Sequence, residues 1–394
     1  MKKLLSLMLV LCLLPMFSLA EHSIAANYIY QMILKQVDGT DFTRYDDDYE
    51  VMFFYPLSKH TYGDAVVRIT AYEDGCTINV SYELPIDEAM MPDVLTFFNY
   101  LNNSLYVGKM MLLDIDGDWY PAYEVFMSIN PEDIDAWDRG CVMDYTFNAF
   151  YVMQEMTDYL PELEKGETPC GCRTFGANDR KNPLHVALTH AIMEETWRIS
   201  PEMRAFLMKK LFSLLLVLAL ALMPTLSLAD DDAACQNLYN MLLDELKSVD
   251  LEMTADEESY RIYLGYALDK NSLGDADVIF DAYSDAVTIN VSYSNPLDEA
   301  LVPQVISFFN RVNSTLYVGK LMVIKSDNVW YAAYEIFLSV NPENITDWDR
   351  NNVLAYTALA LDTMEAMEDY ITEIANGESA DNVFAMWQAD IGAV

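Results

Sequence analysis

Two long stretches of the chain place hydrophobic residues three and four positions apart. In the first stretch these are Val142, Tyr145, Ala149, Met153, Met156, Leu160 and Leu163. In the second they are Val353, Tyr356, Ala360, Met364, Met367, Ile371 and Ile374. This spacing aligns them on one helix face, and it predicts a long helix that packs on a sheet through the stripe. A seam for a dimer or another partner is the alternative.

Shorter segments alternate between apolar and polar residues, as expected of β-strands with one buried face. Predicted strands cover 49–55, 65–72, 77–82, 107–115 and 119–129, with equivalents in the second half of the chain. Predicted helices cover 24–37 and 85–105 in the first half, and 233–246 and 296–316 in the second. The order is α-β-β-β-α-β-β-α, which predicts an α+β fold with an antiparallel sheet packed by helices.

The two halves are copies of one domain. Segments 78–82 and 289–293 both read Ile-Asn-Val-Ser-Tyr, and segments 105–109 and 316–320 both read Leu-Tyr-Val-Gly-Lys. The register holds without a gap from Asp64 and Asp275 to Glu167 and Glu378. Because this period is far longer than that of a solenoid repeat, the sequence predicts two tandem domains, at 21–167 and 230–394.

Each copy follows a segment with the layout of a bacterial secretory signal peptide. Segments 1–20 and 208–229 both have a Lys-Lys pair, an apolar run, a proline and a small-residue cleavage site. The second segment is either a retained transmembrane helix at 211–228 or the start of a second gene product. A retained span would leave Lys209 and Lys210 outside, against the positive-inside rule, so cleavage is favoured.

The stretch 168–207 differs from the rest of the chain. It holds two of the four histidines and two close cysteines, Cys170 and Cys172, and it is nearly neutral. It is either a linker or non-coding sequence that joins two neighbouring genes. The two leaders predict an exported protein, secreted or held in the cell envelope, which is tethered to a membrane if 211–228 is retained.

The chain is strongly acidic, with a formal charge of −39 at pH 7. This charge argues against nucleic acid as a partner, because the phosphates would be repelled. It is compatible with cationic partners or loose cation binding. The sequence does not decide whether Cys76 and Cys141 form a disulfide.

The duplication also restricts the chemistry. All four histidines precede residue 208, and no cysteine of one mature copy has a counterpart in the other. A mechanism common to both copies therefore uses neither histidine, thiolate nor zinc, and we predict no enzymatic activity, cofactor or metal site. Asp114, Asp116 and Asp118 surround Gly117 but lack the later glutamate of a calcium loop, so a hairpin turn is predicted there.

Several short motifs carry a resemblance to a known family. The second helix reads Phe97-Phe98-Asn99-Tyr100-Leu101-Asn102, and Val107-Gly108-Lys109 then begins a strand, turn and strand. The second copy has Phe308-Phe309-Asn310, Asn313 and Val318-Gly319-Lys320. This pattern resembles the YbjN-like family of bacterial sensory transduction regulators, which shares the fold of type III secretion chaperones. The resemblance implies that fold and a binding habit, without an activity, although an exported chain departs from cytoplasmic chaperones.

The residues expected to contact a partner come in equivalent pairs. They are Asn99, Asn102, Lys109 and Glu124 in the first copy, and Asn310, Asn313, Lys320 and Glu335 in the second. Asn99 and Asn102 share a helix face that fits an extended peptide or a cap. Glu124 and Glu335 are expected on the exposed face of their strands, with a buried acid as the alternative.

The predicted function is therefore an exported, non-enzymatic domain in two copies that binds a protein or peptide. The partners considered include a second molecule of the same protein, which would form a dimer. Sheet edges and an apolar groove beside the last helix are the expected surface. The alternative is an envelope domain that binds a small ligand, either a glycan or a cation.

Processing at both leaders gives a direct test. We expect two products in the native envelope, with N-termini near Glu21 and Asp230, because both sites have the small residues that signal peptidase requires. Intact mass and N-terminal sequencing measure this. One full-length product that retains 211–228 would contradict it.

Overall fold

The structure is a computed structural model, and it describes residues 23–38, 41–57, 61–165, 228–248, 253–269 and 272–392. The first leader, the stretch 168–207 and all but the last two residues of 208–229 lie outside this range, so the predictions for them remain predictions. Within the described residues, no helix combines the length and the apolar character needed to cross a membrane.

The first copy contains three α-helices, a short 3-10 helix and six strands among its described residues. Their order is α2 (Ile24–Gln36), β1 (Thr43–Tyr45), β2 (Glu50–Tyr55), β3 (Ala65–Ala71), β4 (Gly75–Tyr82), η1 (Glu88–Met90), α3 (Met91–Asn102), β5 (Lys109–Ile115), β6 (Asp118–Ser128) and α4 (Ala136–Glu164). The second copy repeats this order without the 3-10 helix and adds one α-helix at its end.

The elements of the second copy are α7 (Leu228–Ser248), β7 (Thr254–Asp256), β8 (Arg261–Tyr266), β9 (Ala276–Ala282), β10 (Ala286–Tyr293), α8 (Val302–Asn313), β11 (Lys320–Ser326), β12 (Val329–Ser339), α9 (Asp347–Ala375) and α10 (Ala380–Gly392). The helix α10 follows the point where the sequence repeat ends, and it was not predicted.

Each copy forms a six-stranded antiparallel sheet, with order β1-β2-β3-β4-β6-β5 in the first and β7-β8-β9-β10-β12-β11 in the second. The predicted α+β class and the two similar halves are confirmed. Two details were wrong. The three-residue strands β1 and β7 extend each sheet beyond the predicted five, and the second helix begins at Met91 because Ile86 pairs with Trp119 instead.

The stripe on each long helix is buried, and α4 and α9 pack on the central strands of their sheets. The hydroxyl of Tyr82 donates to the carbonyl of Met153 over 2.7 Å, and Tyr293 makes the same bond to Met364. Sheet packing is thus confirmed as the role of the stripe. Only its second residues, Tyr145 and Tyr356, also bond to the other copy.

Both long helices begin with a capping box. The backbone amide of Asp135 donates to Asp138 over 2.9 Å, and the amide of Asp138 donates back over 3.0 Å. Thr346 and Asp349 repeat this arrangement. Each box satisfies backbone amides at the helix start that have no partner within the helix.

The predicted hairpin at Gly117 is also confirmed. Asp116 and Gly117 have φ values of +56° and +90°, and the amide of Gly117 donates to Asp114 over 3.0 Å. In the second copy Asp327 and Asn328 take the same left-handed conformation, which asparagine tolerates better than most residues. Cys76 and Cys141 are free thiols in this structure, so the disulfide left open by the sequence is absent.

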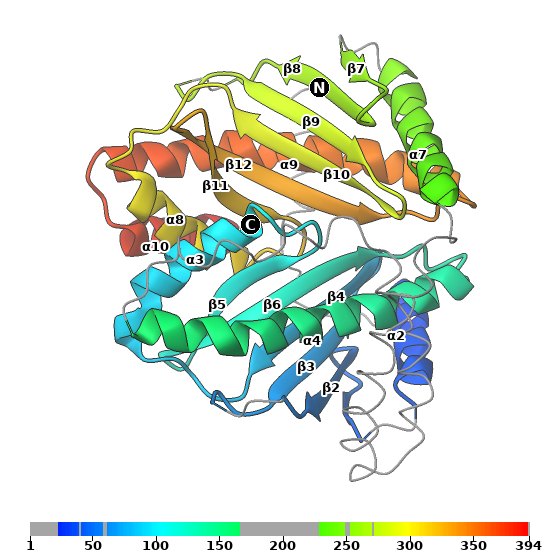
Figure 1. Cartoon of the computed structure of the whole chain (residues 1–394), viewed down its shortest axis with the longest axis horizontal. Helices are drawn as coiled ribbons and strands as arrows, with labels where there is room; N and C mark the ends of the chain where they lie inside the picture. The colour runs from blue at the N-terminus through cyan, green and yellow to red at the C-terminus, as the bar shows by residue number, and fades with distance from the viewer. Residues whose placement is uncertain are drawn as a thin grey trace.

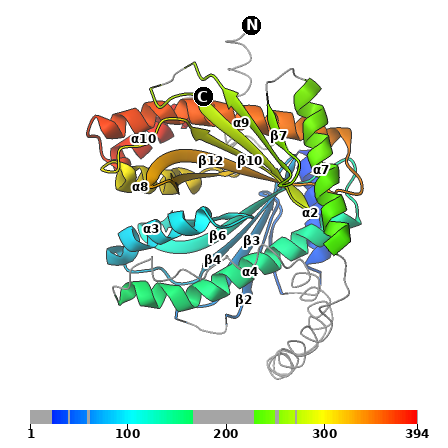
Figure 2. The same cartoon turned by 45° about the horizontal axis from the view of Figure 1, so that its top comes forward.

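The two copies pack against each other. Figure 2 shows α9 and α4 on opposite sides of the molecule with both sheets between them, while α3 and α8 lie side by side. Figure 1 shows α3 and α8 at the middle of the molecule, where α8 contacts the edge strand β5 and α3 contacts the edge strand β11. The sheets also meet where β6 contacts β12.

A half-buried carboxyl at the start of α4, that of Asp138, makes stability depend on pH. Burial raises the pKa of Asp138 from 3.8 to about 6, and nearby acidic residues add to the shift. The folded state then holds this proton more tightly than the unfolded chain, so Asp138 contributes stability below about pH 4 that is lost as the pH rises through about 6.

Asparagine stays neutral at every pH in this range. We therefore expect the wild type to become less stable relative to Asp138→Asn as the pH rises from about 4.5 to about 7.5. Urea denaturation across this range measures it. The exposed Thr96→Ala variant is the control, and its stability relative to the wild type should stay constant because neither side chain titrates in this range. A difference for Asp138→Asn that does not change with pH would contradict this interpretation.

Candidate functional site

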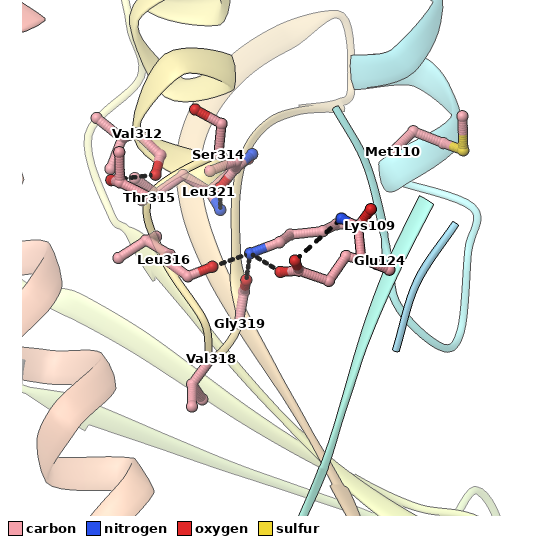
Figure 3. Close-up of polar contacts among 12 residues, drawn as sticks. Lys109, Met110, Glu124, Val312, Ser314, Thr315, Leu316, Val318, Gly319 and Leu321 are labelled. Atoms are coloured by element: carbon pink, nitrogen blue, oxygen red, sulfur yellow. Dashed lines mark hydrogen bonds and ion pairs between the residues drawn. The ribbon is translucent and has the colours of Figure 1, made fainter. Parts of the chain in front are cut away.

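The centre of the interface between the copies is a pair of buried lysines. The side chain of Lys109 is 4% exposed, and its ammonium lies 3.1 Å from Glu124 Oε1 on the neighbouring strand. The same ammonium donates to the backbone carbonyls of Leu316 and Gly319 in the other copy, as Figure 3 shows. Lys109 thus joins its own sheet to a loop of the second copy.

Lys320 makes the equivalent contacts in the opposite direction. Its ammonium lies 2.8 Å from Glu335 Oε1, and it donates to Leu105 over 2.7 Å and to Gly108 over 3.3 Å. The predicted exposure of Glu124 and Glu335 was wrong, because their side chains are only 15% and 19% exposed. The other copy covers the sheet face on which they lie.

The glycine before each lysine allows this geometry. Gly108 and Gly319 both have φ of +72°, and a Cβ on either would collide with the ring of Tyr123 or Tyr334. These tyrosines fix the loop, since Tyr334 donates to the carbonyl of Val318 over 2.6 Å and Tyr123 does the same to Val107. The loop around the Val-Gly-Lys motif therefore offers backbone carbonyls to the lysine of the other copy, while its own lysine bonds to the equivalent carbonyls there.

Burial lowers the pKa of Lys109, while the adjacent carboxylate of Glu124 opposes that shift. A cavity of about 30 Å³ separates the two lysines. It is lined by Tyr106, Gly108, Lys109, Glu124, Phe126, Tyr317, Gly319, Lys320, Glu335 and Phe337. This space is suited to about one water molecule, and the two cations and two anions around it balance.

Tyrosine–aspartate bonds flank the lysines on both sides. Tyr106 donates to Asp285 over 2.7 Å, and Tyr317 donates to Asp74 over 3.2 Å, each across the interface. Tyr356 also donates to Asp74, over 3.0 Å. Burial raises the pKa of Asp74, and the hydrogen bonds from the two tyrosines act against that shift. Nearly the same polar contacts thus occur twice about an approximate twofold axis.

Asn99 binds the edge of the other sheet. Its amide nitrogen donates to the carbonyl of Val323 over 3.0 Å, and its oxygen accepts from the amide of Val323 over 2.9 Å. Asn103 donates to the same carbonyl. The side chain thus takes the place of a neighbouring strand along β11. Its counterpart Asn310 is 7% exposed, and its amide nitrogen has no hydrogen-bond partner among the described residues.

Asn102 and Asn313 lie within their own copies. Asn102 donates to the carbonyl of Met110 over 2.9 Å and accepts from its amide over 2.7 Å, and Asn313 holds Leu321 in the same way. Each therefore fixes a helix to the first residues of the next strand. The structure places Asn99, the two lysines and their two glutamates at the interface, but it does not test whether any predicted residue binds an outside partner.

A second candidate surface was not predicted from the sequence. An open groove of about 880 Å³ covers part of the second sheet. Its lining includes Tyr263, Asp277, Ser292 and Tyr331 from four different strands. Ser292 alternates with Tyr293, whose hydroxyl bonds to α9, so the groove lies on the face opposite the long helix. The polar side of the strand alternation was the signal for this face.

The described strands leave part of the sheet edge beside this groove unpaired. The short strand β7 pairs only with Arg261, Ile262 and Tyr263 of β8. The carbonyl of Tyr260 accepts from β9, so the alternation of an antiparallel strand directs the amide and carbonyl of Gly265 away from β9. No strand of the described residues pairs with Gly265 on that side.

The residues described include no cluster of histidine, cysteine or acidic side chains suited to a metal ion.

Comparisons with known proteins give one structural likeness. No protein-family model and no curated protein matches the chain. The crystal structure of YbjN from E. coli, described as a candidate transcription regulator, matches 34% of this chain and 92% of its own, with 12% identity and a TM-score of 0.26. The resemblance to the YbjN-like family therefore stays a prediction.

The buried ion pair gives a prediction for stability. Lys109→Met leaves Glu124 covered by the other copy without its cation, and we expect the free energy of unfolding to fall by about 3 kcal/mol. Urea denaturation of the intact chain measures the change. Lys165→Met, which removes an exposed ion pair with Glu162, should cost less than about 1 kcal/mol.

A double variant separates the charge from the rest of the contact. Adding Glu124→Leu to Lys109→Met should recover much of the loss, because an unpaired buried charge is the main cost. A double variant no more stable than Lys109→Met would contradict a role for the ion pair.

Proposed function

We propose that the chain is an exported, non-enzymatic binding protein that takes up an extended peptide or protein segment at the open edge of its second sheet. The observation that carries this proposal is the backbone of Gly265, which faces outward beside a groove. An added strand would pair with this backbone and place alternate side chains in the groove.

The interface between the copies supports this choice of surface. Lys109, Lys320 and Asn99 already bond to the other copy, so they offer little to an outside partner in this arrangement. The first copy has a similar open edge, because β1 pairs only with the first three residues of β2. Phe54, the counterpart of Gly265, is 55% exposed there.

Export and the lack of catalysis belong to the proposal on the grounds of the sequence. Two leader-like segments precede the copies, and neither histidine nor cysteine occurs at equivalent positions in both. A function common to both copies would then rest on backbone pairing and apolar contact, which need no ionisable nucleophile.

A glycan is a second candidate for the groove. Tyr263 and Tyr331 offer aromatic rings, while Asp277 and Ser292 offer polar groups beside them. This combination suits a ligand with both apolar faces and hydroxyl groups. A glycan would bind side chains rather than the strand edge.

Two substitutions at one position test the peptide proposal. A random-sequence peptide display library is panned against the intact chain, and the recovered peptides are measured by calorimetry. Gly265→Pro removes the outward amide, and we expect it to weaken binding at least about tenfold. Gly265→Ala keeps the amide, and no atom lies within 4 Å of an added Cβ, so its affinity should stay unchanged.

Tyr331→Ala distinguishes the two ligand classes. A glycan should lose affinity with Tyr331→Ala and keep it with Gly265→Pro. The peptide proposal is wrong if no peptide is enriched, or if the recovered peptides bind Gly265→Pro as tightly as Gly265→Ala.

A further inference from the structure

We propose that Arg311 makes the two copies a matched pair, which stays assembled after the chain is cut between them and which prefers unlike copies to like ones. The guanidinium of Arg311, on α8 of the second copy, lies 5.4 Å from the ring centre of Trp119 in the first copy. This contact crosses the interface in one direction only.

Most other contacts across the interface would allow like copies to pair. Tyr106, Lys109 and Asp74 bond to the other copy, and identical residues occupy the equivalent positions 317, 320 and 285. A surface of this kind is self-complementary about a twofold axis. Something outside this repeated set must therefore select the partner.

The helix α10 holds Arg311 in place. Asp381 pairs with Arg311 over 2.9 Å, and the ring centre of Phe384 lies 5.7 Å from its guanidinium. The helix itself is fixed by buried Val383 and Trp387, and by the amide of Ala380, which donates to Gln304 over 3.1 Å. The sequence repeat ends at Glu378, so the first copy has no equivalent of this helix in its sequence.

The equivalent position in the first copy is different. Tyr100 stands where the second copy has Arg311, and it is 43% exposed. Two first copies would therefore bring Tyr100 to Trp119, with Asp114 on the neighbouring strand and no cation. Such a pair would lose the cation–π contact.

Two second copies would bring too many cations together. Trp330, the counterpart of Trp119, already has the ammonium of Lys325 from its own copy 4.8 Å from its ring centre. Arg311 of another second copy would approach the same ring and be repelled by Lys325. The unlike pair alone matches one cation to each tryptophan.

Cutting the intact chain tests the inference. A protease site is introduced within 168–207, the folded chain is cut, and native mass spectrometry identifies the pairs after dilution and reconcentration. Random pairing would give the first like pair, the unlike pair and the second like pair in the ratio 1:2:1. We expect the ratio of unlike to like pairs to be about tenfold higher than this random value. Separated copies, or a random distribution, would overturn the proposal.

Arg311→Gln should lower the excess of unlike pairs by about fivefold, the effect of losing a cation–π contact and an ion pair. Arg261→Gln is the matched control, because Arg261 lies 5.9 Å from the ring centre of Tyr263 within its own copy, and it should change nothing. If Arg311→Gln unfolds, Trp119→Leu must produce the same loss. An unchanged distribution in folded Arg311→Gln or Trp119→Leu would sink the idea.

Discussion

The buried ammonium of Lys109 sets a condition that the surrounding structure has to meet. A cation taken out of water is costly unless charged and polar groups replace the solvent. Glu124 supplies the charge from the same sheet, but two of the hydrogen-bond acceptors come from the other copy. The loop that offers these acceptors depends on a glycine at φ of +72° and on a tyrosine that holds its carbonyl. Because Lys320 repeats the arrangement, neither copy satisfies its own lysine without the other.

The cations at the interface also reduce the electrostatic repulsion between the two acidic copies. The chain has 62 acidic and 23 basic residues, so two separate copies would repel each other as they approach. Lys109, Lys320 and Arg311 lie at the interface, where the repulsion between acidic halves would be strongest. The acidic residues near them are bonded: Glu124 and Glu335 to lysine, and Asp74 and Asp285 to tyrosine hydroxyls. The interface thus joins two acidic domains without burying an unpaired carboxylate among these residues.

The sheet surfaces that carry Lys109 and Lys320 are covered by the other copy, so other surfaces are left for binding. The long helix covers one side of each sheet, and the partner copy covers the opposite side near Phe126 and Phe337. Among the described residues, no strand pairs with the outward side of Gly265 at the edge of the second sheet, and Tyr331 lines the groove beside it. Whatever binds there would leave the interface between the copies in place.

Periodicity alone determined much of the fold. The spacing from Val142 to Leu163 located the long helix and its buried stripe, and alternation located the central strands, because both patterns reflect which face is apolar. Short strands such as β1 carry too few residues for a pattern, and α10 lies beyond the end of the sequence repeat. The motifs also selected Lys109 and Asn99, yet Glu124 was placed on an exposed face. Alternation identifies the polar side of a strand but cannot show what covers it. Only the tertiary structure brought the second copy there, where each copy supplies the carbonyl acceptors that the buried lysine of the other copy needs.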